Sequence, residues 1–258
     1  MSAGRRILPV RISGLTNRGR ERLRNEDSCF AESDGEKALL VVADGMGGHQ
    51  AGNVASSLAV TAAEKFWQDI NGRELPEKDK TRQMVVTFIR EANDLILAEA
   101  AGSTTKRGMG TTITAALLAG RQLIIGHVGD SRAYLIKDDE IKLLTKDHSL
   151  IEELIASGEV KPEDALNHPQ RHILTRALGV EKYLQVDLLE LEVETDAVIL
   201  LCTDGLTNLV NDREILAAAA AAPDPQELAE KLIEMANERG GYDNITVVIA
   251  SGTGGPND

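Results

Sequence analysis

The sequence predicts an α+β fold in which antiparallel sheets carry pairs of helices on their outer faces. Strand-like apolar runs occur in groups and do not alternate one for one with helices. Apolar residues at helical spacing occur in two pairs of segments, one before and one after a long β-rich middle. Turn residues separate neighbouring strands in that middle, which favours antiparallel pairing. This order disfavours a parallel doubly wound sheet, because such a sheet needs a helix after each strand.

The first part of the chain is expected to form three strands and then two helices. The third strand is a continuous apolar run, which is typical of a strand buried on both faces. Apolar residues then recur every three or four positions, as on the buried side of a helix. The expected strands span 7–15, 29–31 and 38–43, with a charged loop over 17–27, and the expected helices span 54–66 and 85–96.

The middle of the chain is expected to be mostly β. After four short strands, Ser149 and Glu152 have the spacing of a capping box for a short helix that ends at Gly158. A polar, irregular stretch over 159–169 follows and leads to two more strands. The six expected strands span 111–118, 122–128, 132–136, 141–144, 186–191 and 197–203.

The C-terminal part is expected to add two helices, over 212–222 and 225–238, and a last strand over 245–250. Asp224 is a good N-cap for the second helix, with Pro225 in its first turn. The Gly- and Pro-rich tail over about 252–258 is expected to be frayed. Because there is no internal repeat and no clear linker, we expect one domain over 1–258.

Composition limits the classes of function. The 258 residues carry a formal net charge of -13, which argues against a nucleic-acid or membrane surface and is compatible with an Asp-rich metal site or with solubility alone. The two cysteines, Cys29 and Cys202, are expected to be reduced and buried. Since the N-terminus lacks a signal-peptide core and no apolar run reaches about 18 residues, we expect a cytoplasmic protein.

Carboxylates follow three of the apolar strand segments. Asp44 comes directly after the buried run 38–43 and precedes glycines, and Asp204 and Asp130 end two other apolar runs in the same way. Glycine lets the backbone approach a ligand closely, and carboxylate oxygens suit hard cations. A single Asp-Gly pair is most often only a turn.

The wider set of strand-end acids is less easily explained by turns. If these acids gather at one end of the sheets, they repel one another, and cations are needed to keep them ionised. Two Mg²⁺ or Mn²⁺ ions that share a bridging Asp meet this need, and a pair roughly 3.5–4 Å apart activates water for attack on phosphorus. The set comprises Glu26, Asp27, Asp44, Asp130, Asp204 and Asp243.

Nine short motifs occur in order with ordinary spacing, and together they are highly specific although each alone is weak. They are RLRNEDS at 22–28, VADGMGGH at 42–49, GTT at 110–112, VGDSR at 128–132, DHS at 147–149, HP at 168–169, LTRALG at 174–179, TDGL at 203–206 and DNIT at 243–246. Through them the chain resembles the metal-dependent protein serine/threonine phosphatases of the PP2C (PPM) type, in particular the bacterial single-domain members, from about 16 to 250. The resemblance implies a four-layer αββα sandwich of two antiparallel sheets flanked by helix pairs.

The resemblance also implies metal ligands. Asp44 is expected to bridge two tightly bound Mn²⁺ or Mg²⁺ ions, and Asp204 and Asp243 to complete the first. The second is expected to bind the carbonyl of Gly45. Glu26 and Asp27 are expected to bind this second metal directly or through its waters. Asp130, together with Asp204, matches a weaker third metal site.

Two further residues are expected to act on the substrate. Arg22 matches the arginine that holds the substrate phosphate, for which a bidentate, always charged guanidinium is suited; otherwise it is a solvated charge in an Arg-rich loop. His49 could protonate the leaving oxygen, since imidazole titrates near working pH. His127 is expected to be a satisfied core residue. The segment over about 146–179 resembles the mobile flap of the family, where the remaining histidines order the flap or touch substrate.

The implied activity is hydrolysis of phosphoserine and phosphothreonine in proteins by a metal-activated water, with no phosphoenzyme. The expected partners are phosphorylated proteins, among them a Ser/Thr kinase and its substrates, and the protein is expected to be a monomer. One alternative is a partner-switching phosphatase for one small regulatory phosphoprotein. Another is a catalytically dead binding module, although none of the metal aspartates is missing.

Overall fold

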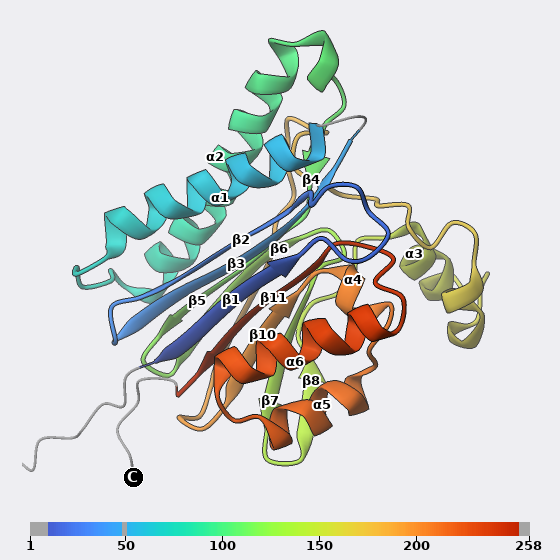
Figure 1. Ribbon diagram of the computed structural model, residues 1–258. Helices are drawn as coiled ribbons and strands as arrows, with labels where there is room; N and C mark the ends of the chain where they lie inside the picture. The colour runs from blue at the N-terminus through green and yellow to red at the C-terminus, as the bar shows by residue number, and fades with distance from the viewer. Residues whose placement is uncertain (1–9, 48–50, 253–258) are drawn as a thin grey trace, which may run out of the picture.

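The computed structural model describes residues 10–47 and 51–252, and it forms four layers (Figure 1). Two antiparallel sheets pack face to face. Helices α1 (Ala51–Ile70) and α2 (Lys78–Ala101) cover one sheet, and α5 (Asp212–Ala221) and α6 (Pro225–Glu238) cover the other. The expected α+β sandwich of two antiparallel sheets between helix pairs is confirmed.

The sheets have mixed sequence order but only antiparallel pairing. The first runs β1-β11-β10-β7-β8 and the second β2-β3-β5-β6-β9, with β4 paired to β3. The strands are β1 (Arg11–Asn17), β2 (Asp27–Ser33), β3 (Lys37–Met46), β4 (Gly110–Thr111), β5 (Ile113–Ala119), β6 (Gln122–Val128), β7 (Arg132–Lys137), β8 (Glu140–Leu143), β9 (Asp187–Glu192), β10 (Val198–Cys202) and β11 (Ile245–Ser251).

Strand β3 shows how the sequence builds two cores at once. Leu39 and Val41 pack under α1 and α2, whereas Leu40 and Val42 lie between the two sheets. All four side chains are fully buried, and burying each one contributes about 1.5–3 kcal/mol. The continuous apolar run therefore marks a strand with two buried faces, as expected.

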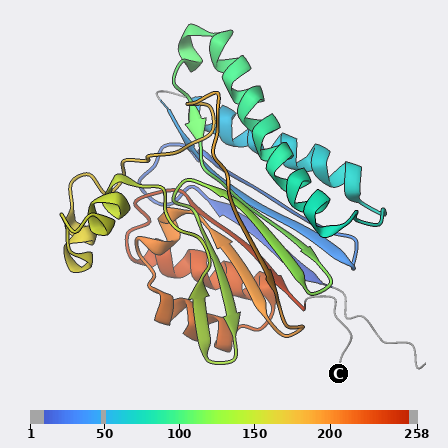
Figure 2. The same cartoon turned by 180° about the vertical axis from the view of Figure 1, so that it is seen from behind.

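The segment over 146–179 leaves the sandwich at one end (Figure 2). It contains α3 (Leu150–Ala156) and the 3₁₀ helix η2 (Pro162–Asn167). A bridge between Ser149 and Leu174 closes the segment at its base, and a bridge between Leu178 and Thr111 ties it to the body. The expected capping box at Ser149 is wrong: its hydroxyl makes no cap bond to α3 and is buried without a partner, because Ser149 pairs inward with Leu174.

Other differences from the expected elements are small. The short helix α4 (Asp204–Thr207) and the 3₁₀ turn η1 (Thr104–Lys106) carry too few residues to give a periodic signal. The N-cap at Asp224 is confirmed by its bonds from the amides of Gln226 and Glu227. Cys202 is buried and Cys29 only half-buried, and neither forms a disulfide. Within the described residues, no helix is both long and apolar enough to cross a membrane.

Candidate active site

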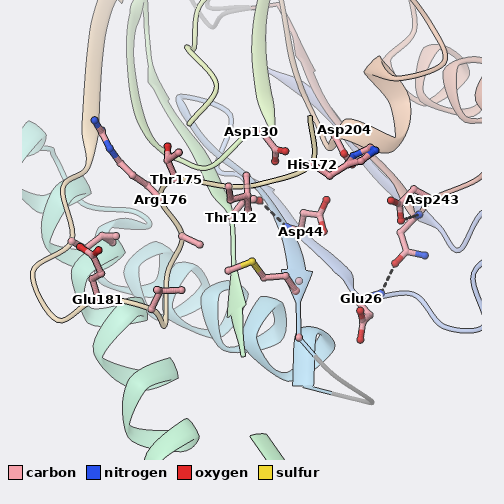
Figure 3. Close-up of a pocket in the computed structure, with 18 of the residues that line it drawn as sticks. Glu26, Asp44, Thr112, Asp130, His172, Thr175, Arg176, Glu181, Asp204 and Asp243 are labelled. Carbon is pink, nitrogen blue, oxygen red and sulfur yellow. Dashed lines mark hydrogen bonds between the residues drawn. The ribbon is translucent and has the colours of Figure 1, made fainter. Parts of the chain in front are cut away.

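Five of the acids expected to bind metal line one pocket of about 850 Å³ at the end of the sandwich (Figure 3). Antiparallel pairing brings them together, because the end of β3 lies beside the start of β2, and the end of β10 beside the start of β11. The five acids are Glu26, Asp44, Asp130, Asp204 and Asp243, and Arg22 and Gly45 line the same pocket.

Asp44 lies at the centre of this pocket and is held through its backbone. Its amide donates to the Thr112 hydroxyl at 2.9 Å, and its carbonyl accepts from the Thr112 amide at 2.9 Å and from the Thr111 hydroxyl at 2.8 Å. Burial raises the pKa of Asp44 well above its usual value, and repulsion from Asp27 and Asp204 adds to the rise. The backbone is thus fixed while the carboxylate lacks compensating charge.

Gly45 allows three backbone segments to meet beside Asp44. Its amide donates to the Glu26 carbonyl at 3.1 Å. A side chain at this position would clash with the carbonyl oxygens of Gly52 and Glu26, so only glycine fits here.

Asp204 begins α4 and has one satisfied oxygen. Its Oδ2 accepts from the Asn208 amide group at 3.0 Å, but its Oδ1 is buried and has no hydrogen-bond partner. Burial raises the pKa of Asp204, and the neighbouring Asp243 raises it further. A buried carboxylate oxygen without a donor is costly unless a cation or water reaches it.

Asp27 lies behind the pocket and is not among the residues that line it. Its Oδ2 accepts from the hydroxyls of Thr203 at 2.9 Å and Thr246 at 2.6 Å, and its Oδ1 is buried without a partner. Burial raises the pKa of Asp27 to about 7. Its position suits a group that supports the ligands from behind.

Asp130 follows Gly129 directly and lines the pocket near Asp204 (Figure 3). Gly129 is fixed by His148, whose amide donates to the Gly129 carbonyl at 2.7 Å and whose Nδ1 accepts from the Gly129 amide at 3.1 Å. Burial and repulsion from Asp204 raise the pKa of Asp130 to about 8.

Arg22 and Asp243 form an ion pair at the mouth of the pocket, with 2.7 Å between Nη2 and Oδ2. The neighbouring Asn244 holds the chain that carries Arg22: its side-chain amide donates to the carbonyls of Arg18 and Arg24 at 2.9 Å each, and its Oδ1 accepts from the Glu26 amide at 2.7 Å. Arg22 is therefore a pocket residue, not a charge that only faces bulk water.

The histidines differ in position. His49 lies outside the described residues. His127 is buried, with its ring nitrogens bonded to the Thr114 hydroxyl and the Lys146 carbonyl, as expected of a core histidine. His148 lies at the base of the 146–179 segment, and His172 lines the pocket.

The donor set fits hard divalent cations. It is made of oxygens, two of which are buried without partners, and burial together with repulsion between the acids raises the pKa of Asp44 and Asp130. Within the described ranges, no three Asp, Glu, His or Cys side chains form a ready ligand cage. The acids share a pocket but are not gathered around one point, so cations would bind through few direct protein ligands and several waters.

Two residues that support the site, Asn93 and Arg176, were not among the expected site residues. Asn93 of α2 donates to the Glu181 carbonyl and accepts from the Gly179 amide, at 2.9 and 2.8 Å, and so fixes one rim of the pocket. Arg176 binds Asp187 at 2.8 Å beside His148. A polar residue on the apolar face of the second helix was the available signal for Asn93.

Comparisons with known proteins agree with this geometry. The family model described as protein phosphatase 2C matches residues 16–238. The serine/threonine phosphatase stp of Listeria innocua is 42% identical over 236 residues, which cover 91% of this chain and 92% of that protein. The protein phosphatase PhpP of Streptococcus pneumoniae is 36% identical over 244 residues, covering 94% and 97%.

Solved structures give the same result. The crystal structure of the Mycobacterium tuberculosis serine/threonine phosphatase PstP/Ppp has a TM-score of 0.85 at 39% identity, covering 95% of this chain and 99% of that one. The catalytic domain of PstP in complex with two manganese ions has a TM-score of 0.83 at 37% identity, covering 94% and 98%. The resemblance inferred from the nine motifs is thereby confirmed, and the chain belongs to the protein phosphatase 2C family.

Proposed function

We propose that this protein hydrolyses phosphoserine and phosphothreonine in other proteins, at a site that holds Mn²⁺ or Mg²⁺. The observation that carries the proposal is the combination of buried, uncompensated carboxylates and an arginine in one open pocket. Neither feature alone is specific, but together they provide for cations and for a phosphate. The similar proteins are named as serine/threonine phosphatases, which supports the same conclusion.

The chain's own residues would hold the cations from three sides. Asp44 lies between Asp204 and Glu26 and is suited to bridge two ions (Figure 3). Gly45, the next residue, lines the same pocket and would offer its carbonyl. Asp204 and Asp243 would complete one site. Glu26 would support the other at the pocket wall, and Asp27 would support the ligands from behind. When bound, such ions make water nucleophilic at neutral pH and neutralise phosphate oxygens.

Arg22 would bind and orient the phosphate. Its guanidinium is half-exposed and is held at the pocket mouth by Asp243. Two cations bound to the acids would compete with Arg22 for Asp243, which would leave the guanidinium fork to two phosphate oxygens. His49 remains the proposed proton donor to the leaving Ser or Thr oxygen.

Asp130 supports a third, weaker cation site together with Asp204. The two carboxylates line the same pocket, and repulsion from Asp204 adds to the effect of burial in raising the pKa of Asp130. A site with few protein ligands and many waters binds loosely. We propose either Mn²⁺ or Mg²⁺ for all three sites.

The proposed setting is a monomeric, single-domain cytoplasmic enzyme over 1–258 whose 146–179 segment acts as the flap. A Ser/Thr kinase and its substrates are the proposed sources of phosphoprotein. The partner-switching alternative requires a single small phosphoprotein substrate. The open pocket, with Arg22 at its mouth, favours the broader range of substrates.

The test is hydrolysis of a small aryl phosphate and of a phosphothreonine peptide after chelation and after return of Mn²⁺ or Mg²⁺. We expect no turnover with chelator and full turnover with either ion at millimolar concentration. Calorimetry of the metal-free protein should show two tight sites. Turnover that persists in chelator would refute the metal site, and metal binding without turnover would favour the dead binding module.

A further inference from the structure

We propose, on the basis of the phosphatase function above, that a second cleft beside the active site binds an anionic side chain of the substrate. The enzyme would then prefer phosphopeptides with a carboxylate or a second phosphate on one side of the reacting residue. The second cleft encloses about 340 Å³ and is lined by Arg22, Arg171, His172, Asn208, Tyr242 and Asp243, among others.

The two clefts adjoin. Arg22, His172 and Asp243 line both of them, so a peptide whose phosphate sits in the first pocket can place a neighbouring side chain in the second. One residue of extended chain spans about 3.3–3.6 Å. A side chain one to three positions from the phosphoresidue therefore has the right reach.

The lining of the second cleft carries a net positive charge, because the described part of the chain lines it with Arg22 and Arg171 but with one acid, Asp243. Arg171 comes from the 146–179 segment and donates to the His172 ring at 2.9 Å, and Arg22 comes from the loop after β1. This loop holds Arg18, Arg20, Arg22 and Arg24 with one acid, Glu21, in a protein whose net charge is -13. All four arginines are exposed. Among the ion pairs of the described residues, Arg22 is the one member of the four that takes part.

The arginine loop is held rigidly. Asn244 binds the carbonyls at both ends of the loop, those of Arg18 and Arg24, and the Arg20 amide donates to the Gly241 carbonyl at 2.8 Å. Gly19 has φ +76, and a side chain there would clash with the Asp243 carbonyl. A fixed loop presents its charges at little entropic cost, which favours binding of a complementary anion.

The opposite rim of the active-site pocket has a different chemistry. It is formed by Val180, Glu181, Tyr183 and Leu184, with Tyr183 87% exposed. This rim carries the acid Glu181, and the charge of the nearby Arg176 is offset by Asp187. The second cleft has two arginines and one acid among its described lining residues, so an anionic group is favoured on that side. The preference must therefore depend on which side of the phosphoresidue carries the anion.

The experiment compares phosphothreonine peptides that differ only at flanking positions. Each carries Ala, Glu, Lys or phosphoserine at positions one to three on either side, and KM and kcat are measured with the Mn²⁺-loaded enzyme. We expect Glu on one side to lower KM by about three- to tenfold, with a larger effect for phosphoserine, and less than about twofold on the other side. An equal effect of Glu and phosphoserine would identify a simple carboxylate site.

Two variants locate the preference. Arg171→Glu should reverse it, so that Lys on the sensitive side becomes the better flank. Arg73→Glu makes the same charge change in the exposed turn after α1, far from the cleft, and should leave the ratio of KM values unchanged.

The outcomes separate this inference from the proposed function. If the parent peptide and a small aryl phosphate are not hydrolysed, the phosphatase proposal fails. If they are hydrolysed but Glu has no effect, or the same effect on both sides, the anion cleft is overturned. An equal response of the two charge-reversal variants would also overturn it, because the preference would then come from net charge alone.

Discussion

At the two ends of the β2–β3 hairpin, folding shifts the pKa of aspartates in opposite directions. At the turn, Asp34 pairs with the Lys37 ammonium at 2.8 Å and accepts from the amides of Glu36 and Lys37 at 3.0 and 2.8 Å. Burial alone raises the pKa of Asp34, but the bonds from Lys37 and these amides lower it to about 2. At the open end, Asp27 and Asp44 are cross-strand partners, and burial raises the pKa of both.

The two ends differ because, within the ranges that the structure describes, only the turn has a cationic side chain beside its aspartate. Lys37 pairs with Asp34 there, so the ionised carboxylate stabilises the fold. At the open end, the one ion pair that these acids make among the described residues is that of Asp243 with Arg22. Buried charge without compensation lowers stability. Because the fold keeps uncompensated acids at one end of the hairpin only, we infer that this end binds cations from solution.

The largest effect is expected for Asp204→Asn, which removes charge from the open end. The variant should bind metal poorly and lose at least ~10²-fold in rate, because a ligand charge is gone. Its metal-free form should be no less stable than the wild type, since repulsion with Asp243 is relieved. Rates are measured over a Mn²⁺ titration. A near-normal kcat at saturating Mn²⁺ would falsify the two-metal assignment.

The next effect is expected for Asp130→Ala. We expect a folded protein with two tight metal sites and a loss of activity on the order of 30-fold that extra Mn²⁺ does not recover. Calorimetry and kinetics at several Mn²⁺ concentrations provide the measurement. Full activity would make Asp130 a turn residue, and loss of the two tight sites would make it part of the binuclear centre.

The metal-free protein should lose stability as the pH rises. An acid whose pKa is raised by folding binds more protons in the folded state, so the free energy of unfolding falls between its unfolded and folded pKa values. For Asp27 that window runs from about 4 to about 7. We expect a loss of about 1–2 kcal/mol between pH 5 and 8 in denaturant titrations.

Two controls sharpen this result. Saturating Mn²⁺ should reverse the trend, because cations bind the ionised acids and the folded state alone. Asp27→Asn should make the stability of the metal-free protein depend less on pH. The hydroxyls of Thr203 and Thr246 can still donate hydrogen bonds to the side-chain oxygen of the asparagine. A metal-free protein that becomes more stable from pH 5 to 8 would contradict the conclusion that the acids at the open end lack compensating positive charge.

Sequence reasoning could predict most of the fold because the apolar pattern determines burial directly. Residues 38–43 are apolar throughout and form a strand with two buried faces, and Asp224 has the amide bonds of an N-cap. It failed where the outcome depends on distant contacts. Ser149 has the spacing of a capping box, but its pairing with Leu174 turns the hydroxyl inward.

The candidate site shows the same division. The order of the motifs indicated six acids, and the fold brings five of them to one pocket. The motif order could not separate Asp27, behind the pocket, from Glu26 on its wall, because the two acids are adjacent in one motif and the motif does not tell which of them faces the pocket. Nor could it identify the role of Asn244, whose partners Arg18 and Arg24 are more than two hundred positions away.

The smallest effect is expected at the turn, for Asp34→Asn. The asparagine can still accept one amide bond but cannot pair with Lys37, which is itself buried and would lose its counter-charge. We expect a loss of about 1 kcal/mol at pH 7, since the variant loses the ion pair but keeps one amide hydrogen bond. The pKa of Asp34 is lowered by folding, so its contribution exists above about pH 4 and disappears as the pH falls towards 2. Wild type and variant should therefore converge below pH 3 and run parallel from pH 5 to 8, with kcat unchanged. A difference that grows between pH 5 and 8 would mean that the turn senses the same protons as the active site, and the two ends of the hairpin would not be independent.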